Sequence, residues 1–382
     1  MIERAIQPQI VKRWGTGRAI VLLGPRQVGK TTLLKKICET FPSYRFFDAD
    51  QASDRALLEN QDLAPLKQAI GNESIVFIDE AQRIKNVGLT LKIITDQLPE
   101  VQLVVSGSSA LELGNEINEP LTGRKWEFRL YPISWGELSQ NLGTFEAKKQ
   151  LPVRLVFGMY PNVITYVGDE PAVLNELISS YLYRDLLEYN GIRKPELINK
   201  LLTALAFQLG NEVSLNELSR LLEVSKETVS TYLDLLEKAF IIFRLDPLSR
   251  NLRNEINTNR KFYFYDNGVR NAVIGDYKPL PLRADTGALW ENFIVSERIK
   301  YLSYTQSWAK SYFWRTYQRQ EIDYVEEKDG SFRAYEIKWN PKRRVKFPAA
   351  FMDAYAPEEA SVVQPENFGV FLDFSVPNEA AR

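Results

Sequence analysis

The stretch GPRQVGKTT, residues 24–32, has residue types that suit the binding of phosphate groups. Four residues separate Gly24 from the run Gly29-Lys30-Thr31, which is the spacing of the phosphate-binding loop (P-loop). Glycines let backbone N–H groups approach phosphate oxygens, the lysine reaches the β- and γ-phosphates, and the threonine ligates Mg²⁺. The pattern follows an apolar strand and opens a helix, so we expect it to bind ATP and Mg²⁺. The alternative is a glycine-rich turn that binds no ligand. The residues expected to contact the nucleotide are Gly24, Gln27, Val28, Gly29, Lys30, Thr31 and Thr32.

An acidic pair, Asp79 and Glu80, closes the apolar stretch SIVFID. Such a pair often marks only a solvated strand end, but beside a P-loop we expect Asp79 to hold Mg²⁺ through water and Glu80 to orient the attacking water. The next apolar stretch ends in three serines, Ser106, Ser108 and Ser109, at the sheet edge where ligands bind. Any of them could contact the γ-phosphate or the water, and we choose Ser108 as catalytic.

A second pair of acids lies in the stretch EIDYVEEKDGSFRAYEIKW, residues 321–339. Two alternating runs flank Asp329-Gly330, which suits a two-residue hairpin turn, and counting outward from that turn places Asp323 opposite Glu336. Facing carboxylates are destabilising unless a cation lies between them, and Lys338 shares their face. The tripeptide Glu-x-Lys recurs at 146–148 and 326–328, so only the facing aspartate distinguishes this copy. The alternative is a surface hairpin whose charges face solvent.

The elements that must position these residues change in kind along the chain. In the first 140 residues, short apolar strands at 19–24, near Phe46, at 74–79 and at 101–107 alternate with helical patterns, which predicts an α/β fold with a parallel sheet. Residues 137–210 are predicted to be mainly helical. Residues 214–238 form two short amphipathic helices joined through Val224 and Ser225, and aromatic-rich strands then alternate with one helix at 287–302.

Composition restricts the chemistry. The 382 residues include no histidine, which removes histidine triads and histidine-bound zinc and leaves carboxylates, lysines and arginines. The single cysteine, Cys38, fits a reducing cytoplasm, and no apolar run approaches the length of a membrane span, so no membrane partner is expected. The net charge of −1 means that any surface for nucleic acid must be local.

Several motifs together resemble a family of AAA-type P-loop ATPases of bacteria and archaea whose C-terminal half is a domain of unknown function. The resemblance covers nearly the whole chain and rests on GPRQVGKTTL, FIDEAQ, SGSSALEL, LTGRKWEFRLYPISWGEL, GMYP, YLYRDLL, GALWENF, EIDYV and YEIKW. It implies an ATPase core at 1–138, a helical lid at 139–198, a winged helix at 199–262 and an α/β domain similar to PD-(D/E)xK nucleases at 263–382.

The resemblance also implies roles for individual residues. Arg124 is implied as a catalytic arginine finger or γ-phosphate sensor, acting in cis or, in a homo-oligomer, in trans. Its alternative is an ordinary loop arginine. In the nuclease-like domain, Asp323 and Glu336 are expected to bind Mg²⁺, Lys338 to orient or stabilise the attacked phosphate, and Glu291 to be an additional acid. The alternative is a nuclease fold kept as a binding platform.

The charge pattern bears on nucleic acid. The presumed recognition helix, 226–238, is net acidic, so sequence-specific DNA reading is not expected of it, and a structural or protein-docking role is at least as well supported. Residues 244–261 are basic, and a second basic segment is predicted to contact the phosphate backbone through Lys342, Arg343, Arg344 and Lys346.

The function expected from the sequence is a Mg²⁺-dependent, cytoplasmic ATPase coupled to binding or remodelling of nucleic acid, most simply DNA. Two alternatives are a nucleotide-controlled switch that acts on a protein partner with an inactive nuclease-like domain, and a passive nucleic-acid-binding module. The intact Lys30, Asp79 and Glu80 argue against the second.

Overall fold

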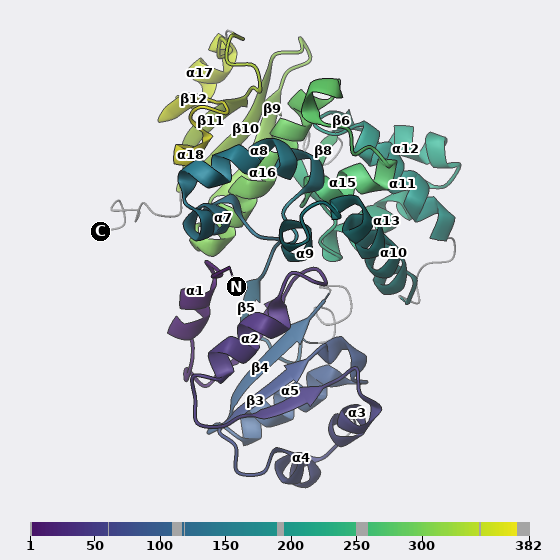
Figure 1. Ribbon diagram of the computed structural model, residues 1–382, viewed down its shortest axis with the longest axis vertical. Coiled ribbons are helices and arrows are strands. Elements are labelled where there is room, and N and C mark those ends of the chain that lie inside the picture. Colours follow the sequence, from purple (N-terminus) through teal and green to yellow (C-terminus); the bar gives the residue numbers. More distant parts are fainter. Residues whose placement is uncertain are drawn as a thin grey trace. The chain divides into compact units, whose positions relative to one another are not determined.

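The computed structural model describes residues 2–59, 61–108, 117, 119–188, 195–249, 259–343 and 345–372, and Figure 1 labels its elements. The chain divides into two compact units. The first comprises residues 3–132 and 238–240, and the second comprises residues 133–237 and 241–382. Each unit is built around one sheet.

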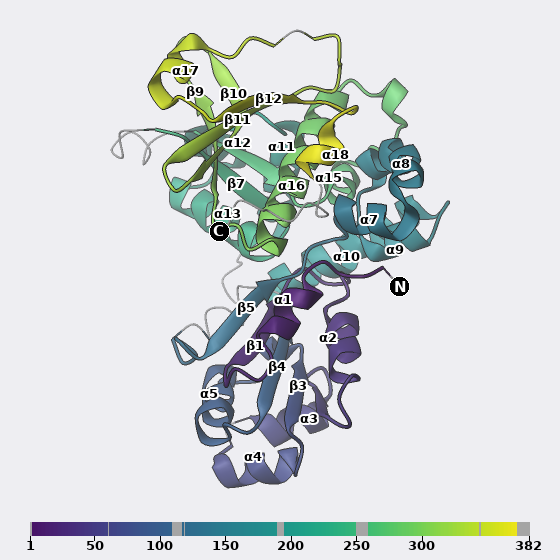
Figure 2. The same ribbon diagram turned by 90° about the vertical axis from the view of Figure 1, so that its left-hand side faces the viewer.

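The first unit contains a five-stranded parallel sheet in the order β2-β3-β4-β1-β5. Its strands β1, β3 and β4 are buried along their whole length, because parallel strands are covered on both faces. Figure 2 shows helices α2 and α5 on opposite sides of this sheet. The predicted parallel α/β fold and its four strands are therefore confirmed. The bounds are β1 (Ala19–Leu23), β2 (Arg45–Asp48), β3 (Ile75–Asp79), β4 (Gln102–Gly107), β5 (Lys125–Arg129), α1 (Gln7–Lys12), α2 (Lys30–Cys38), α3 (Ala52–Leu58), α4 (Leu63–Ile70), η1 (Ala81–Arg83) and α5 (Val87–Gln97).

The second unit begins with helices, as the sequence predicts. They are α7 (Trp135–Leu142), α8 (Thr144–Phe157), α9 (Pro161–Thr165), α10 (Glu170–Glu188) and α11 (Pro195–Phe207). The two predicted short helices are α12 (Leu215–Leu222) and α13 (Lys226–Lys238). Further helical elements among the described residues are α15 (Asn267–Ile274), η2 (Leu280–Leu282), α16 (Thr286–Tyr304), α17 (Ala349–Tyr355) and α18 (Phe368–Phe371).

A mixed seven-stranded sheet runs through the second unit in the order β12-β11-β10-β9-β7-β8-β6. Its strands are β6 (Glu212–Val213), β7 (Ile242–Pro247), β8 (Arg260–Phe264), β9 (Lys310–Arg315), β10 (Glu321–Lys328), β11 (Ser331–Ile337) and β12 (Glu359–Val363). The antiparallel strands β6, β7 and β8 accompany α12 and α13, and β7 then pairs in parallel with β9. One continuous sheet therefore connects two regions that the sequence presents as successive domains.

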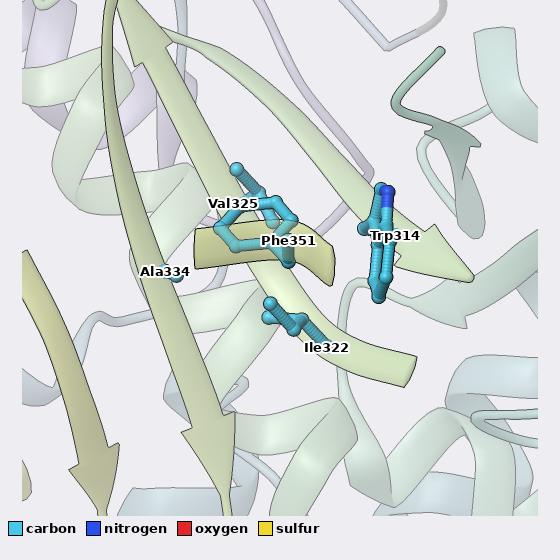
Figure 3. Packing of buried hydrophobic residues seen from close by; sticks show 5 residues of the cluster. All are labelled: Trp314, Ile322, Val325, Ala334 and Phe351. Atoms are coloured by element: carbon cyan, nitrogen blue, oxygen red, sulfur yellow. The ribbon is translucent and has the colours of Figure 1, made fainter. Parts of the chain in front are cut away.

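One face of β9, β10 and β11 carries an apolar core under α17. Figure 3 shows this cluster, which comprises Trp314, Ile322, Val325, Ala334 and Phe351. The rings of Trp314 and Phe351 meet edge to face with centroids 5.2 Å apart. Ile322 and Val325 share this core although they are three residues apart, because the pairing of β10 with β9 shifts between them. This bulge places Asp323 at an irregular point of the strand.

The predicted hairpin register is confirmed. Strand β10 pairs antiparallel with β11 from Lys328 opposite Ser331 to Tyr324 opposite Tyr335. The turn residues Asp329 and Gly330 have φ values of 52° and 84°, and a two-residue hairpin turn with both central φ values positive suits an Asp-Gly pair. One step beyond the last paired residues lie Asp323 and Glu336.

Candidate functional site

The P-loop connects the end of β1 to the start of α2, and its glycines are required by backbone geometry. A Cβ atom on Gly24 would lie 2.0 Å from the carbonyl oxygen of Leu130, so no larger residue fits there. Gly29 has a φ of 94°, which L side chains rarely adopt, and Gln27 has a φ of 59°. Val28 is fully buried, whereas Gln27 and Thr32 are exposed. The predicted loop residues therefore form one connected turn at the carboxyl end of the sheet.

Lys30 lies folded against this loop. Its side chain is 4% exposed and Nζ donates hydrogen bonds of 2.9 Å to the carbonyl oxygens of Gly24 and Pro25. Arg4, which the sequence analysis did not select, supports the loop from outside the motif. Its guanidinium donates to the carbonyl oxygens of Val28 and Tyr131, each at 2.6 Å, and so ties the loop to the segment that follows β5.

A hydrogen-bonded chain joins the start of α2 to the ends of β3 and β4. It comprises Thr31, Asp79 and Ser106. Thr31 Oγ1 donates to the carboxylate of Asp79, at 2.8 Å from Oδ2, and Ser106 Oγ donates to Asp79 Oδ1. Burial raises the pKa of Asp79, and the hydrogen bonds from Ser106 and Thr31 oppose that increase. A hydroxyl and a buried carboxylate that converge in this way fit a Mg²⁺ ion, because a cation would stabilise the charged acid.

Glu80 and Ser108 meet through a residue that the sequence analysis did not select, Gln82. The side-chain amide of Gln82 donates to Glu80 Oε2 at 2.5 Å and to Ser108 Oγ at 2.8 Å. Gln82 follows Glu80 by two residues within FIDEAQ, and its place in that motif is the only signal the sequence offers. Ser109, the other serine considered, lies outside the described residues.

Arg124 is not near the P-loop of its own chain. Its carbonyl oxygen accepts a hydrogen bond from the N–H of Ala19, the first residue of β1, while the P-loop follows the last residue of that strand. At about 3.3 Å per residue, these ends are roughly 15 Å apart, which exceeds the reach of an arginine side chain. The guanidinium instead pairs with Asp96 at 2.5 Å. In this structure Arg124 therefore lies out of reach of its own P-loop, and its role as an arginine finger or γ-phosphate sensor, in cis or in trans, stays a prediction.

The hairpin acids of the second unit are brought together around Lys338. Lys338 Nζ lies 2.6 Å from Asp323 Oδ2 and 2.7 Å from Glu336 Oε2, so those oxygens are no further apart than the sum of these distances. Asp323 Oδ2 also accepts a hydrogen bond of 2.8 Å from the N–H of Ile337. The pKa of Glu336 is raised to about 7, first by burial and then by the neighbouring Asp323, while Lys338 acts in the opposite direction.

Glu291 belongs to a neighbouring cluster. Its Oε1 accepts a hydrogen bond of 2.7 Å from Tyr263 and lies 3.5 Å from Nζ of Lys261, which also pairs with Glu321 at 2.5 Å. Burial raises the pKa of Glu291, Lys261 lowers it and Asp323 raises it. Within the described parts of the chain, no three acidic or cysteine side chains are grouped to hold a metal ion. Glu291 interacts electrostatically with Asp323, and its role as an additional acid stays a prediction.

The predicted basic segment follows β11 directly. Lys342, Arg343 and Lys346 are exposed. The fourth predicted residue, Arg344, lies outside the described residues, as do 250–258 of the other basic segment. Across the described ranges, no helix is long and apolar enough to cross a membrane.

Family models match three successive parts of the chain. A model described as an AAA domain matches residues 16–139, which contain the P-loop, Asp79, Glu80 and Arg124. A domain of unknown function (DUF8612) matches residues 148–279, and another (DUF4143) matches residues 286–376. The carboxylate–lysine clusters thus fall in regions whose family descriptions name no activity.

Relatives of this chain occur in bacteria and archaea. An uncharacterized protein of Mycobacterium tuberculosis is 29% identical over 324 residues, which cover 84% of this chain and 70% of that protein. An uncharacterized protein of Methanocaldococcus jannaschii is 26% identical over 300 residues, covering 72% and 65%. The structure of a Walker-type ATPase of Pyrococcus abyssi matches with a TM-score of 0.50 at 17% identity, over 72% of this chain and 96% of that chain. The chain therefore contains an AAA-type P-loop ATPase-like fold, followed by a second, sheet-containing region.

Proposed function

We propose that this protein is a Mg²⁺-dependent ATPase whose nucleotide cycle is coupled to binding or remodelling of nucleic acid by its C-terminal half. The observation that carries the ATPase part is the convergence of the P-loop, Lys30 and the Thr31–Asp79 contact at one edge of the parallel sheet. AAA-type folds that retain these groups are suited to nucleotide hydrolysis, and the AAA domain match supports that reading.

Each of these residues has a separate task in the proposal. The loop N–H groups and Lys30 would hold the phosphates, Thr31 and Asp79 would hold Mg²⁺, and Glu80 would orient the attacking water. Bound Mg²⁺ would supply neutralisation of the phosphate charge. Lys30 must leave the carbonyl oxygens of Gly24 and Pro25 to reach a phosphate, and a charged acceptor there would be a stronger partner than either carbonyl.

The nucleic-acid part rests on the basic segment after β11. The side chains of Lys342, Arg343 and Lys346 are exposed, so their charges are available to a phosphate backbone. We interpret α11 to α13 with β6, β7 and β8 as a winged helix. Asp234 and Glu237 of α13 lie 3.6 Å from Arg244, and such a net acidic helix suits contact with protein better than reading of bases.

A second candidate function is a nucleotide-controlled switch in which the nuclease-like region binds without cutting. The specific observation in its favour is the position of Lys338, whose ammonium group lies between the two carboxylates that a catalytic metal would need. Glu291 accepts a hydrogen bond from Tyr263 and pairs with Lys261, which also favours binding without cleavage. In this reading the region similar to PD-(D/E)xK nucleases is a docking platform.

The test is phosphate release from ATP with Mg²⁺, measured alone and with single-stranded, duplex and branched DNA. We expect hydrolysis by the wild-type protein, stimulation by at least one DNA, and no hydrolysis by Lys30→Ala. Hydrolysis that no DNA changes, together with absence of DNA binding at low salt, would favour the switch. Absence of nucleotide binding by the wild-type protein would refute both functions.

A further inference from the structure

The backbone at Glu80 is held in an unusual conformation. Glu80 has a φ of 51°, in the left-handed region that residues with a side chain rarely adopt, and it caps the single turn η1. Its N–H donates a hydrogen bond of 3.2 Å to Ser106 Oγ at the end of the adjacent strand β4. The main chain of the proposed catalytic acid is therefore fixed, and only its side chain needs a further restraint.

Gln82 supplies that restraint. Its Nε2 lies 2.5 Å from Glu80 Oε2 and 2.8 Å from Ser108 Oγ, so one amide group joins the acid to the serine that we assign to the γ-phosphate or the water. The orientation of the amide follows from chemistry, since an ionised carboxylate only accepts hydrogen bonds and the NH₂ group must face it.

The other half of the same amide has no hydrogen-bond partner among the described residues. Gln82 Oε1 is buried, and no group in the described part of the chain donates to it. A buried acceptor without a donor is unfavourable. The conformation of the Gln82 side chain is therefore determined by the hydrogen bonds of Nε2 to Glu80 and Ser108, and not by a hydrogen bond to Oε1. Such a locally unsatisfied group is expected where a side chain serves a site.

We propose that Gln82 is a positioning residue of the ATP site, which holds the carboxylate of Glu80 beside Ser108 in the orientation that directs the attacking water. The inference rests on the proposed ATP hydrolysis and adds to it a residue outside the P-loop and the Asp79-Glu80 pair. Loss of the amide should leave phosphate and Mg²⁺ contacts in place, because Lys30 and Thr31 are hydrogen-bonded to Gly24, Pro25 and Asp79. It should release the side chain of Glu80.

A purely structural role is the competing explanation, because Gln82 also links the ends of β3 and β4. The two explanations differ in what a variant does to binding and to turnover. A positioning role affects kcat and spares nucleotide affinity, whereas loosening of the strand ends would affect both.

The experiment compares Gln82→Met, which keeps the length of the side chain and removes its polar atoms, with wild type, Glu80→Gln and the control Gln97→Met. Gln97 is exposed at the end of α5. Binding of a fluorescent ATP analogue and steady-state phosphate release are measured for each. We expect Gln82→Met to bind within about twofold of wild type and to lose roughly 100-fold in kcat, as misplacement of a catalytic group by about 1 Å can do. Gln97→Met should match wild type.

Combination with Glu80→Gln gives the decisive comparison. Adding Gln82→Met to Glu80→Gln should cause little further loss if the two act together. If Gln82→Met is poorly folded, Gln82→Asn, which keeps an amide too short to span both partners, should show the same split between affinity and turnover. Wild-type kcat in a folded Gln82 variant, or equal losses of affinity and kcat, would overturn the inference and leave the ATPase intact. No hydrolysis by the wild-type protein would overturn the proposed function itself.

Discussion

Replacement of Glu336 by glutamine tests whether the hairpin acids form an electrostatically strained pair. Glu336 is 7% exposed, and its pKa is raised from 4.5 to about 7, first by burial and then by Asp323. The carboxyl group of Glu336 therefore binds its proton more tightly in the folded protein than in the unfolded chain. By linkage, the contribution to stability is complete below pH 4.5 and is lost as the pH rises through 7.

The size of the effect follows from the pKa. Each tenfold change in proton affinity is worth about 1.4 kcal/mol, so a change from 4.5 to about 7 corresponds to at most about 3 kcal/mol. Lys338 lies 2.7 Å from Glu336, and its opposing effect is already included in that pKa. Glu336→Gln cannot ionise and should not lose this stability at alkaline pH. Relative to wild type, the variant should gain up to about 3 kcal/mol between pH 4.5 and 8.

The assay is urea unfolding of both proteins at several pH values, followed by tryptophan fluorescence, in a Lys30→Ala background that silences the ATP site. Glu327→Gln makes the same change near the turn of the hairpin and controls for loss of a charge. A wild-type minus variant difference that does not change with pH would refute the reasoning. If the pair also binds metal, Mn²⁺ should raise the melting temperature of the parent, and Glu336→Gln should abolish that rise.

Three further predictions concern the ATP site and the basic segment. Glu80→Gln should bind ATP like wild type while turnover falls roughly 100-fold or more, and undiminished phosphate release would remove its proposed role. Arg124→Ala should also bind ATP normally yet hydrolyse it poorly, and mixing it with Glu80→Gln subunits should restore activity if Arg124 acts on a neighbouring subunit. A protein that is strictly monomeric by light scattering and fully active in phosphate release would contradict the role of Arg124 on a neighbouring subunit. Reversal of Lys342 and Arg343 to glutamate should weaken DNA binding and reduce the salt dependence of log K by about 0.9 for each lost phosphate contact; unchanged affinity would favour the protein switch.

Features that depend on neighbouring residues were predictable. The P-loop spacing, the acidic pair after a buried strand and the Asp-Gly turn all lie within a few residues, where strand alternation and turn geometry dictate the arrangement. The register that places Asp323 near Glu336 follows from the turn alone, and the observed pairing of β10 with β11 agrees with it. The parallel sheet of the first unit was likewise predictable, because strands covered on both faces appear as continuous apolar runs.

Contacts between distant segments were decided only by tertiary structure. Arg124 appeared in a suggestive motif, yet the parallel pairing of β1 with β5 carries it to the far end of the sheet. Lys261 reaches Glu291 and Glu321 across 30 and 60 residues, and the pairing of β7 with β9 makes one sheet of two regions. Gln82 reaches Ser108 because β3 and β4 are neighbours in the sheet. In each case the physical reason is the same: local propensity does not specify strand order or side-chain contacts between segments, which are set by how the sheets and helices pack.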